Sequence, residues 1–182
     1  LFGLVSSYSW DALSPGDNPR LDLVGLVQRD FGPAYVGVPL GQYVELAPGV
    51  SQATYGSLTT IANFGSSDYA TGGYGIAPNG FLARTADGSL IAAIAAGTFN
   101  GTTLAPGEHD FVVERTAAAV TVHQPIGADT DVGVDVPAGW SVAHAMALGA
   151  DGAPLGTLSG TLANGRFVFR YSGTVGGVRV AS

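Results

Sequence analysis

Turn-forming dipeptides between short apolar segments are the feature that most constrains the fold of this chain. Asp87-Gly88 joins Phe81–Ala86 to Ser89–Ala96, and Asn164-Gly165 joins a second pair of expected strands, Gly156–Leu162 and Arg166–Tyr171. Such pairs favour tight hairpins, because both central residues of a type I′ turn have positive φ. Short segments at this spacing, without helical patterns between them, predict an all-β fold. We expect an antiparallel β-sandwich, either Ig-like or jelly-roll-like.

Two segments alternate strictly between apolar and polar residues. In Asp129–Val136 the valines alternate mostly with aspartates, and in Arg166–Tyr171 the aromatic residues alternate with two arginines and a valine. A period of two places each apolar set on one face of a strand, against a core. If these two strands are neighbours, their Asp and Arg faces can pair across the strands, contributing about 0.2–1 kcal/mol per pair.

The first part of the chain has a different pattern. Asn18-Pro19 resembles a helix cap followed by proline in the first turn, and Leu21–Arg29 is compatible with a short helix. In that helix, Leu23, Val24 and Val27 are expected to face inward. The Leu and Val content also allows a strand here. We therefore predict an N-terminal appendage, residues 1–32, that is helical or irregular, followed by a β-sandwich domain, residues 33–182.

The composition bounds the environment and the class of protein. The chain contains no Cys, which excludes a disulfide scaffold and a thiolate metal site. Charged residues are only 12% of the chain and Gly reaches 28 residues, which suits a secreted or cell-surface protein. No apolar stretch approaches the roughly 18 residues that a membrane-spanning helix needs. We expect a secreted or cell-surface location and no membrane span.

The charge balance is acidic. Asp and Glu number 14 against seven cations, all of them Arg, and the formal net charge is −7. A chain without lysine and with so few arginines offers no basic patch for phosphates. We therefore expect no nucleic-acid partner.

Catalytic motifs are scarce. A glycosidase needs two carboxyl groups facing each other about 5–10 Å apart. Glu45 and Glu114 lie in strand-like segments, but nothing in the spacing singles out a pair. The chain has no G-x-S-x-G motif, and its three histidines lack the spacing of a zinc site. Whether the protein is an enzyme stays open, with the balance towards a non-catalytic domain.

Calcium is the one cofactor that the sequence leaves open, because it needs only oxygen ligands on loops or strand ends. Asp129, Asp131 and Asp135 form one candidate set. A second candidate set is Asp11, Asp17 and Asn18. Neither set matches the full EF-hand loop.

Aromatic residues are the remaining signal for a ligand. Trp10, Tyr69 and Tyr74 are predicted ligand-binding residues, because exposed aromatic faces stack on the apolar faces of sugar rings. Tyr69 and Tyr74 lie in the irregular, Gly- and Ser-rich segment 64–81. The alternative for each is packing in the core or at a sheet edge.

The C-terminal half resembles the accessory β-sandwich domains of large secreted actinobacterial carbohydrate-active enzymes. The resemblance covers roughly residues 80–182, and it implies a module without catalytic residues of its own. It rests on four segments: Leu104–Arg115, His123–Asp131, Val136–Trp140 and Gly165–Gly173.

Three functions remain. The first is a secreted, non-catalytic β-sandwich module that binds or positions a polysaccharide, beside a catalytic domain of a larger enzyme. The second is a self-assembling surface, pilus-like or virion subunit, in which residues 1–7 add a strand to a neighbour's sheet. The third is a small glycoside hydrolase or lyase that uses Glu45 or Glu114.

Overall fold

The structure is a computed structural model, and it describes residues 19–141 and 143–182. Predictions on Trp10, on the calcium set Asp11, Asp17 and Asn18, and on residues 1–7 fall outside this part of the chain. The helix is α1 (Pro19–Tyr35). The strands are β1 (Gln42–Ala47), β2 (Val50–Tyr55), β3 (Leu58–Asn63), β4 (Tyr69–Thr71), β5 (Tyr74–Ile76), β6 (Phe81–Thr85), β7 (Leu90–Phe99), β8 (Thr102–Arg115), β9 (Val120–Ile126), β10 (Thr130–Asp135), β11 (His144–Leu148), β12 (Pro154–Leu158), β13 (Gly160–Ala163), β14 (Arg166–Tyr171) and β15 (Gly177–Ala181).

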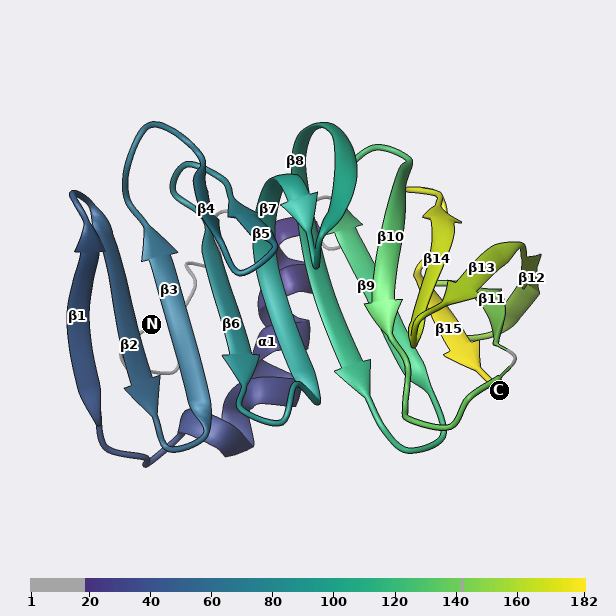
Figure 1. Ribbon diagram of the computed structural model, residues 1–182, viewed down its shortest axis with the longest axis horizontal. Coiled ribbons are helices and arrows are strands. Elements are labelled where there is room, and N and C mark those ends of the chain that lie inside the picture. The colour runs from purple at the N-terminus through teal and green to yellow at the C-terminus, as the bar shows by residue number, and fades with distance from the viewer. Residues whose placement is uncertain (1–18, 142) are drawn as a thin grey trace.

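Two antiparallel sheets of unequal size form the fold. The main sheet has 12 strands; ten follow the order β1-β2-β3-β6-β7-β8-β9-β15-β11-β12, with β4 and β5 paired off this path. The second sheet has three strands, in the order β10-β14-β13, and it lies in front of the C-terminal part of the main sheet (Figure 1). The prediction of an all-β, antiparallel, sandwich-like fold is confirmed.

The predicted hairpins form, with one difference in geometry. Asn164 and Gly165 have φ of 53° and 74° and join β13 to β14, as expected for a type I′ turn. Between β6 and β7 only Gly88 has positive φ, because Asp87 instead binds neighbouring polar groups with its side chain. The expected strand Gly156–Leu162 is divided into β12 and β13, which belong to different sheets.

The helix covers the back face of the main sheet, behind β6, β7 and β8 in Figure 1. Leu23, Val27 and Phe31 recur at helical spacing and pack against Ala92 and Val112 of the sheet. The helix runs past the expected end at residue 29 and through the proposed boundary between residues 32 and 33. Val24 is only partly buried, in contrast to Leu23 and Val27.

The second core lies between the two sheets. Phe167, Phe169 and Tyr171 of β14 are buried there with Phe111 of β8, as the alternation predicted. On the outer face of this second sheet, the expected Asp and Arg positions are opposite one another in the register, and one of the two pairs, Asp131 with Arg170, forms an ion pair. Asp131 is opposite Arg170 at 3.4 Å, and Asp135 is opposite Arg166.

The second sheet covers only part of the front face of the main sheet. The part formed by β1, β2, β3 and β6 has no strand of the second sheet in front of it (Figure 1). Among the described residues, no helix is both long and apolar enough to cross a membrane.

Candidate functional site

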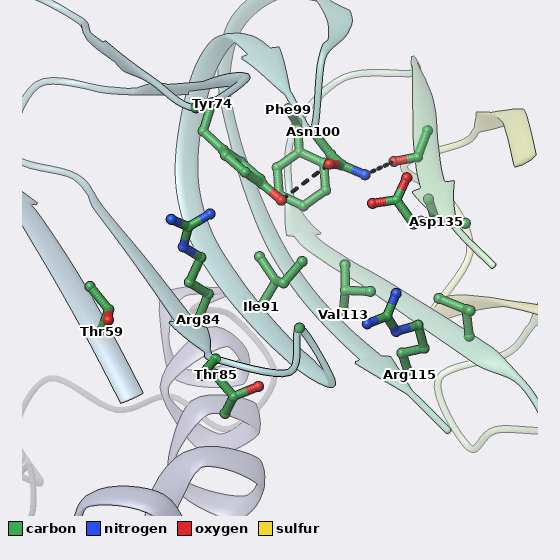
Figure 2. A pocket seen from close by; sticks show the side chains of 16 residues that line it. Thr59, Tyr74, Arg84, Thr85, Ile91, Phe99, Asn100, Val113, Arg115 and Asp135 are labelled. Carbon is green, nitrogen blue, oxygen red and sulfur yellow. Dashed lines mark hydrogen bonds between the residues drawn. The ribbon is translucent and has the colours of Figure 1, made fainter. Parts of the chain in front are cut away.

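A cavity of about 430 Å³ opens on the front face, beside the free edge of β10. Its floor is apolar, with Ile91 from β7 and Val113 from β8. Its rim is polar and charged, as Figure 2 shows. The labelled rim residues are Thr59, Tyr74, Arg84, Asn100, Arg115 and Asp135.

The register of the strands explains why two of the rim residues lie beside the residues of the floor. Thr59 pairs with Arg84, Arg84 with Ile91, and Ile91 with Val113. Residues directly opposite one another project to the same face of a sheet, so these side chains form one row across β3, β6, β7 and β8. The row brings a hydroxyl, a guanidinium and two apolar side chains into the cavity.

The same row continues beyond the cavity onto the uncovered front face. Thr59 is opposite Thr54 of β2, and Thr54 is opposite Gln42 of β1. Gln42 is exposed and Thr54 is partly exposed. Adjacent strands are about 4.8 Å apart, so polar groups repeat at this interval from the sheet edge to Arg84. We call this series (Gln42, Thr54, Thr59, Arg84) the polar row.

Tyr74 forms the upper wall of the cavity in Figure 2. The residue is 6% exposed, and its ring meets that of Phe99 edge-on, with centroids 5.4 Å apart and an interplanar angle of 86°. Its hydroxyl donates to Oδ1 of Asn100 at 3.2 Å, and burial raises the pKa of this phenol above its ordinary value. The expectation that Tyr74 offers an exposed face for stacking is therefore wrong. A ligand contact through its hydroxyl stays a prediction.

Asn100 connects the two sheets. It has φ of 46° in the turn between β7 and β8, and its Nδ2 donates to the carbonyl oxygen of Gly133 on β10 at 3.2 Å. Asn tolerates this left-handed backbone better than most residues. The Tyr74 hydroxyl, the Asn100 amide and the Gly133 carbonyl therefore form one hydrogen-bonded chain along the cavity wall.

Arg115 lies at the lower rim, held by the turn between β6 and β7. Its Nη2 donates to the backbone oxygen of Asp87 at 2.6 Å. The Asp87 carboxylate binds within the turn, where it accepts from Thr85 and from the Ser89 amide and hydroxyl, and these bonds lower its pKa to about 2. Asp87 thus orients Arg115 through its backbone, and no ion pair joins their side chains within the described chain.

Asp135 is the only carboxylate among the described residues that line the cavity. Its register partner Arg166 extends over Gly133 and reaches Gly101, so that Arg166 lies just outside the rim. The Arg166 Nη2 is buried and finds no hydrogen-bond partner in the described part of the chain. The cavity is thus flanked by three guanidinium groups and one carboxylate.

The carboxylates considered for hydrolysis lie elsewhere. Glu45 is exposed on the edge strand β1. Glu114 is partly buried on β8 and lies 3.7 Å from Arg29 of the helix, on the back of the sheet. Neither faces Asp135 across the cavity, so the described residues provide no opposed pair of carboxyl groups there.

The other predicted ligand residues are dispersed. Tyr69 of β4 is partly buried against the core and does not line the cavity. Arg170 binds both the Asp129 carbonyl oxygen, at 2.9 Å, and the Asp131 carboxylate, so a guanidinium occupies the space between them. The described residues contain no cluster of three acidic or histidine side chains suited to a metal. Calcium binding by Asp129, Asp131 and Asp135 stays a prediction from the sequence.

Sequence reasoning brought Tyr74 and Asp135 into consideration, but not as members of one site. It missed Arg84, Arg115 and Asn100. The available signal was the scarcity of cations: with seven arginines in the chain, each one on an outward strand position is a candidate for function.

Comparison with known proteins adds no relative: no family model, curated protein or solved structure matches the chain. The function must therefore be argued from the geometry of the site.

Proposed function

We propose that this protein is a non-catalytic polysaccharide-binding module, and that it binds its ligand in the cavity and along the polar row. The observation that carries the proposal is the combination of an apolar floor, Ile91 and Val113, with a rim of hydrogen-bonding groups. A sugar ring has the same two kinds of surface, with apolar faces and hydroxyl groups around its edge. Binding sites commonly combine apolar walls with a few placed polar groups.

The polar row supports a linear ligand rather than a single sugar. Gln42, Thr54 and Thr59 extend from the cavity to the sheet edge at intervals of about 4.8 Å, close to the length of one sugar unit. No strand of the second sheet, as far as residues 19–141 and 143–182 describe it, covers this face. An extended glycan can therefore lie across the strands, with one unit in the cavity and further units over the row.

The number of carboxylates that line the cavity supports a non-catalytic function. Both inverting and retaining hydrolysis use two carboxyl groups on opposite sides of the scissile bond. The described lining of the cavity supplies only Asp135. A secreted or cell-surface location and a neighbouring catalytic domain belong to the same proposal, in line with the resemblance of residues 80–182 to accessory domains.

Binding of soluble neutral and acidic polysaccharides, measured by isothermal titration calorimetry, tests this function. Thr59→Trp places a large side chain over the polar row, and Ile91→Asp places a charge on the floor. Both are expected to abolish binding, while Thr157→Asp, at an exposed position of the distant strand β12, retains it. Thermal melting of each variant checks the fold. Absence of binding to every polysaccharide overturns the proposal.

A second candidate function, self-assembly, is favoured by a separate observation. Of eight large hydrophobic side chains that are exposed in the described chain, six lie on β1, in the segment 36–41 that leads to it, or beside the turn that follows it. Among the described strands, β1 pairs only with β2, and its other edge is left unpaired by this part of the chain. Edge strands usually carry protective charges, often Lys, whereas β1 has no Lys and a single charged residue, Glu45. The six residues are Val36, Leu40, Tyr43, Val44, Leu46 and Phe64.

A further inference from the structure

We propose that the polysaccharide is acidic, and that the cavity holds a carboxylate of a uronic acid unit between Arg84 and Arg115. This inference rests on the proposed function and specifies its ligand. It begins from an imbalance of charge. The protein has twice as many acidic residues as arginines, 14 against seven, yet no described carboxylate forms an ion pair with the arginines around the cavity.

The described arginines divide into two groups. One group forms ion pairs with nearby carboxylates: Arg20, Arg29 and Arg170. The other group forms no ion pair with a described residue: Arg84 and Arg115 line the cavity, Arg166 lies just outside its rim, and Arg179 lies on β15 away from it. In an acidic protein, three unneutralised guanidinium groups around one cavity indicate a site for an anion.

The placement of the two lining arginines suits a planar anion. Arg84 projects from β6 on one side of the apolar floor, and Arg115 lies on the other side (Figure 2). The bond from Arg115 to the Asp87 carbonyl uses one nitrogen and fixes the side chain, which leaves its other N–H groups for a ligand. A guanidinium fork matches the two oxygens of a carboxylate, and such bonds are stronger than neutral ones.

Asp135 determines where the anion binds. Its carboxylate repels a second anionic group, so it favours the neutral hydroxyl groups of the same or the next sugar. The protein as a whole repels polyanions, because its formal net charge is −7. Attraction of a polyanion therefore depends on the local arginines rather than on the overall field.

Oligogalacturonates and their methyl esters provide the test, because the two ligands share one backbone and differ in the charge of the carboxyl group. Affinities are measured by calorimetry at fixed ionic strength in EDTA, which removes bridging cations. Loss of a charge-assisted bond typically costs about 1.5–3 kcal/mol, or about ten- to a hundredfold in affinity. We expect Arg84→Gln and Arg115→Gln each to lose at least about tenfold in affinity for the acid, and Arg115→Lys to recover only part of it.

The matched control is Arg179→Gln, which removes an exposed arginine of β15 that does not line the cavity. It is expected to bind the acid as the unmodified protein does. Equal affinity for the acid and its ester overturns the carboxylate assignment while leaving the module a polysaccharide binder. Preference for dextran sulfate over oligogalacturonate also overturns it. Failure to bind any polysaccharide, charged or neutral, overturns the proposed function together with this inference.

Discussion

Arg20, in the first turn of α1, places Nη1 3.2 Å from Oδ2 of Asp110, whose side chain is fully buried on the back of β8. The other carboxylate oxygen of Asp110 has no hydrogen-bond partner among the described residues. Burial raises the pKa of Asp110 to about 7, Arg20 acts in the opposite direction, and Glu108 adds to the increase. The contact between helix and sheet therefore contains a carboxyl group that titrates near neutral pH.

This pair predicts that stability falls as the pH rises. The pKa of Asp110 is about 7 in the folded protein, above the ordinary 3.8. Between pH 3.8 and pH 7 the folded protein therefore binds one proton more than the unfolded chain does. The stabilisation by this proton is complete below about pH 4 and is lost as the pH rises through 7, at up to ~1.4 kcal/mol per pH unit. Urea unfolding between pH 4 and 8 measures this slope.

Asp110→Asn keeps the shape of the side chain and removes its titration. We expect its unfolding free energy to depend less on pH between 4 and 7, and to equal or exceed that of the unmodified protein at pH 8. Arg20 keeps its contact with Glu108 in this variant. Identical pH profiles for the two proteins would contradict the buried-acid account.

Gly75 predicts a steric effect on the wall of the cavity. A Cβ at this position of β5 would overlap the carbonyl oxygen of Ala96 on β7, and backbone atoms cannot move away as a side chain does. Gly75→Ala is expected to lower the unfolding free energy by about 1–3 kcal/mol and to weaken glycan binding by displacing Tyr74. Gly25→Ala, in the helix with nothing near its Cβ, should stabilise by up to ~1 kcal/mol. Thermal melting of both variants tests these two opposite changes in stability.

The exposed edge strand predicts association. If β1 pairs with another chain, sedimentation velocity should show oligomers that increase with concentration, and Val44→Lys should return the protein to monomer because lysine blocks edge pairing. Leu155→Lys, on β12 at the other end of the sheet, is the control. Deleting residues 1–7 distinguishes a role of the N-terminal segment from direct pairing of β1. A monodisperse unmodified protein at millimolar concentration contradicts self-assembly.

Local chemistry explains why much of the fold could be predicted from the sequence. The turn at Asn164-Gly165 depends on the backbone freedom of two adjacent residues, and the alternation in Arg166–Tyr171 depends only on the pleat. The division of Gly156–Leu162 could not be predicted, because nothing local marks the point where the chain leaves one sheet for the other. The helix extends to Tyr35 because Phe31 is buried against the sheet, which is a tertiary contact.

The site depends on information that the local sequence does not contain. Arg84, Ile91 and Val113 meet only through the register of three strands, and Asp135 joins them from the second sheet. Tyr74, which the sequence proposed as a ligand residue, lines the cavity, but its ring is packed against Phe99 of another strand, a contact that the local sequence does not show. The sequence names candidate side chains by their chemistry, but it does not show which of them are neighbours in the folded protein.

Tyr74→Phe separates the structural role of the hydroxyl from a role in binding. The variant keeps the ring contact with Phe99 and leaves Oδ1 of Asn100 without its donor, which should cost about 0.5–1.5 kcal/mol of stability. If the hydroxyl also contacts the ligand, affinity falls equally for an acidic glycan and its methyl ester, unlike the effect at Arg84. Tyr171→Phe removes the buried hydroxyl that accepts from the backbone N–H of Gln124, outside the cavity, and should reduce stability alone. Equal affinities of Tyr74→Phe and the unmodified protein for both glycans limit Tyr74 to supporting the wall.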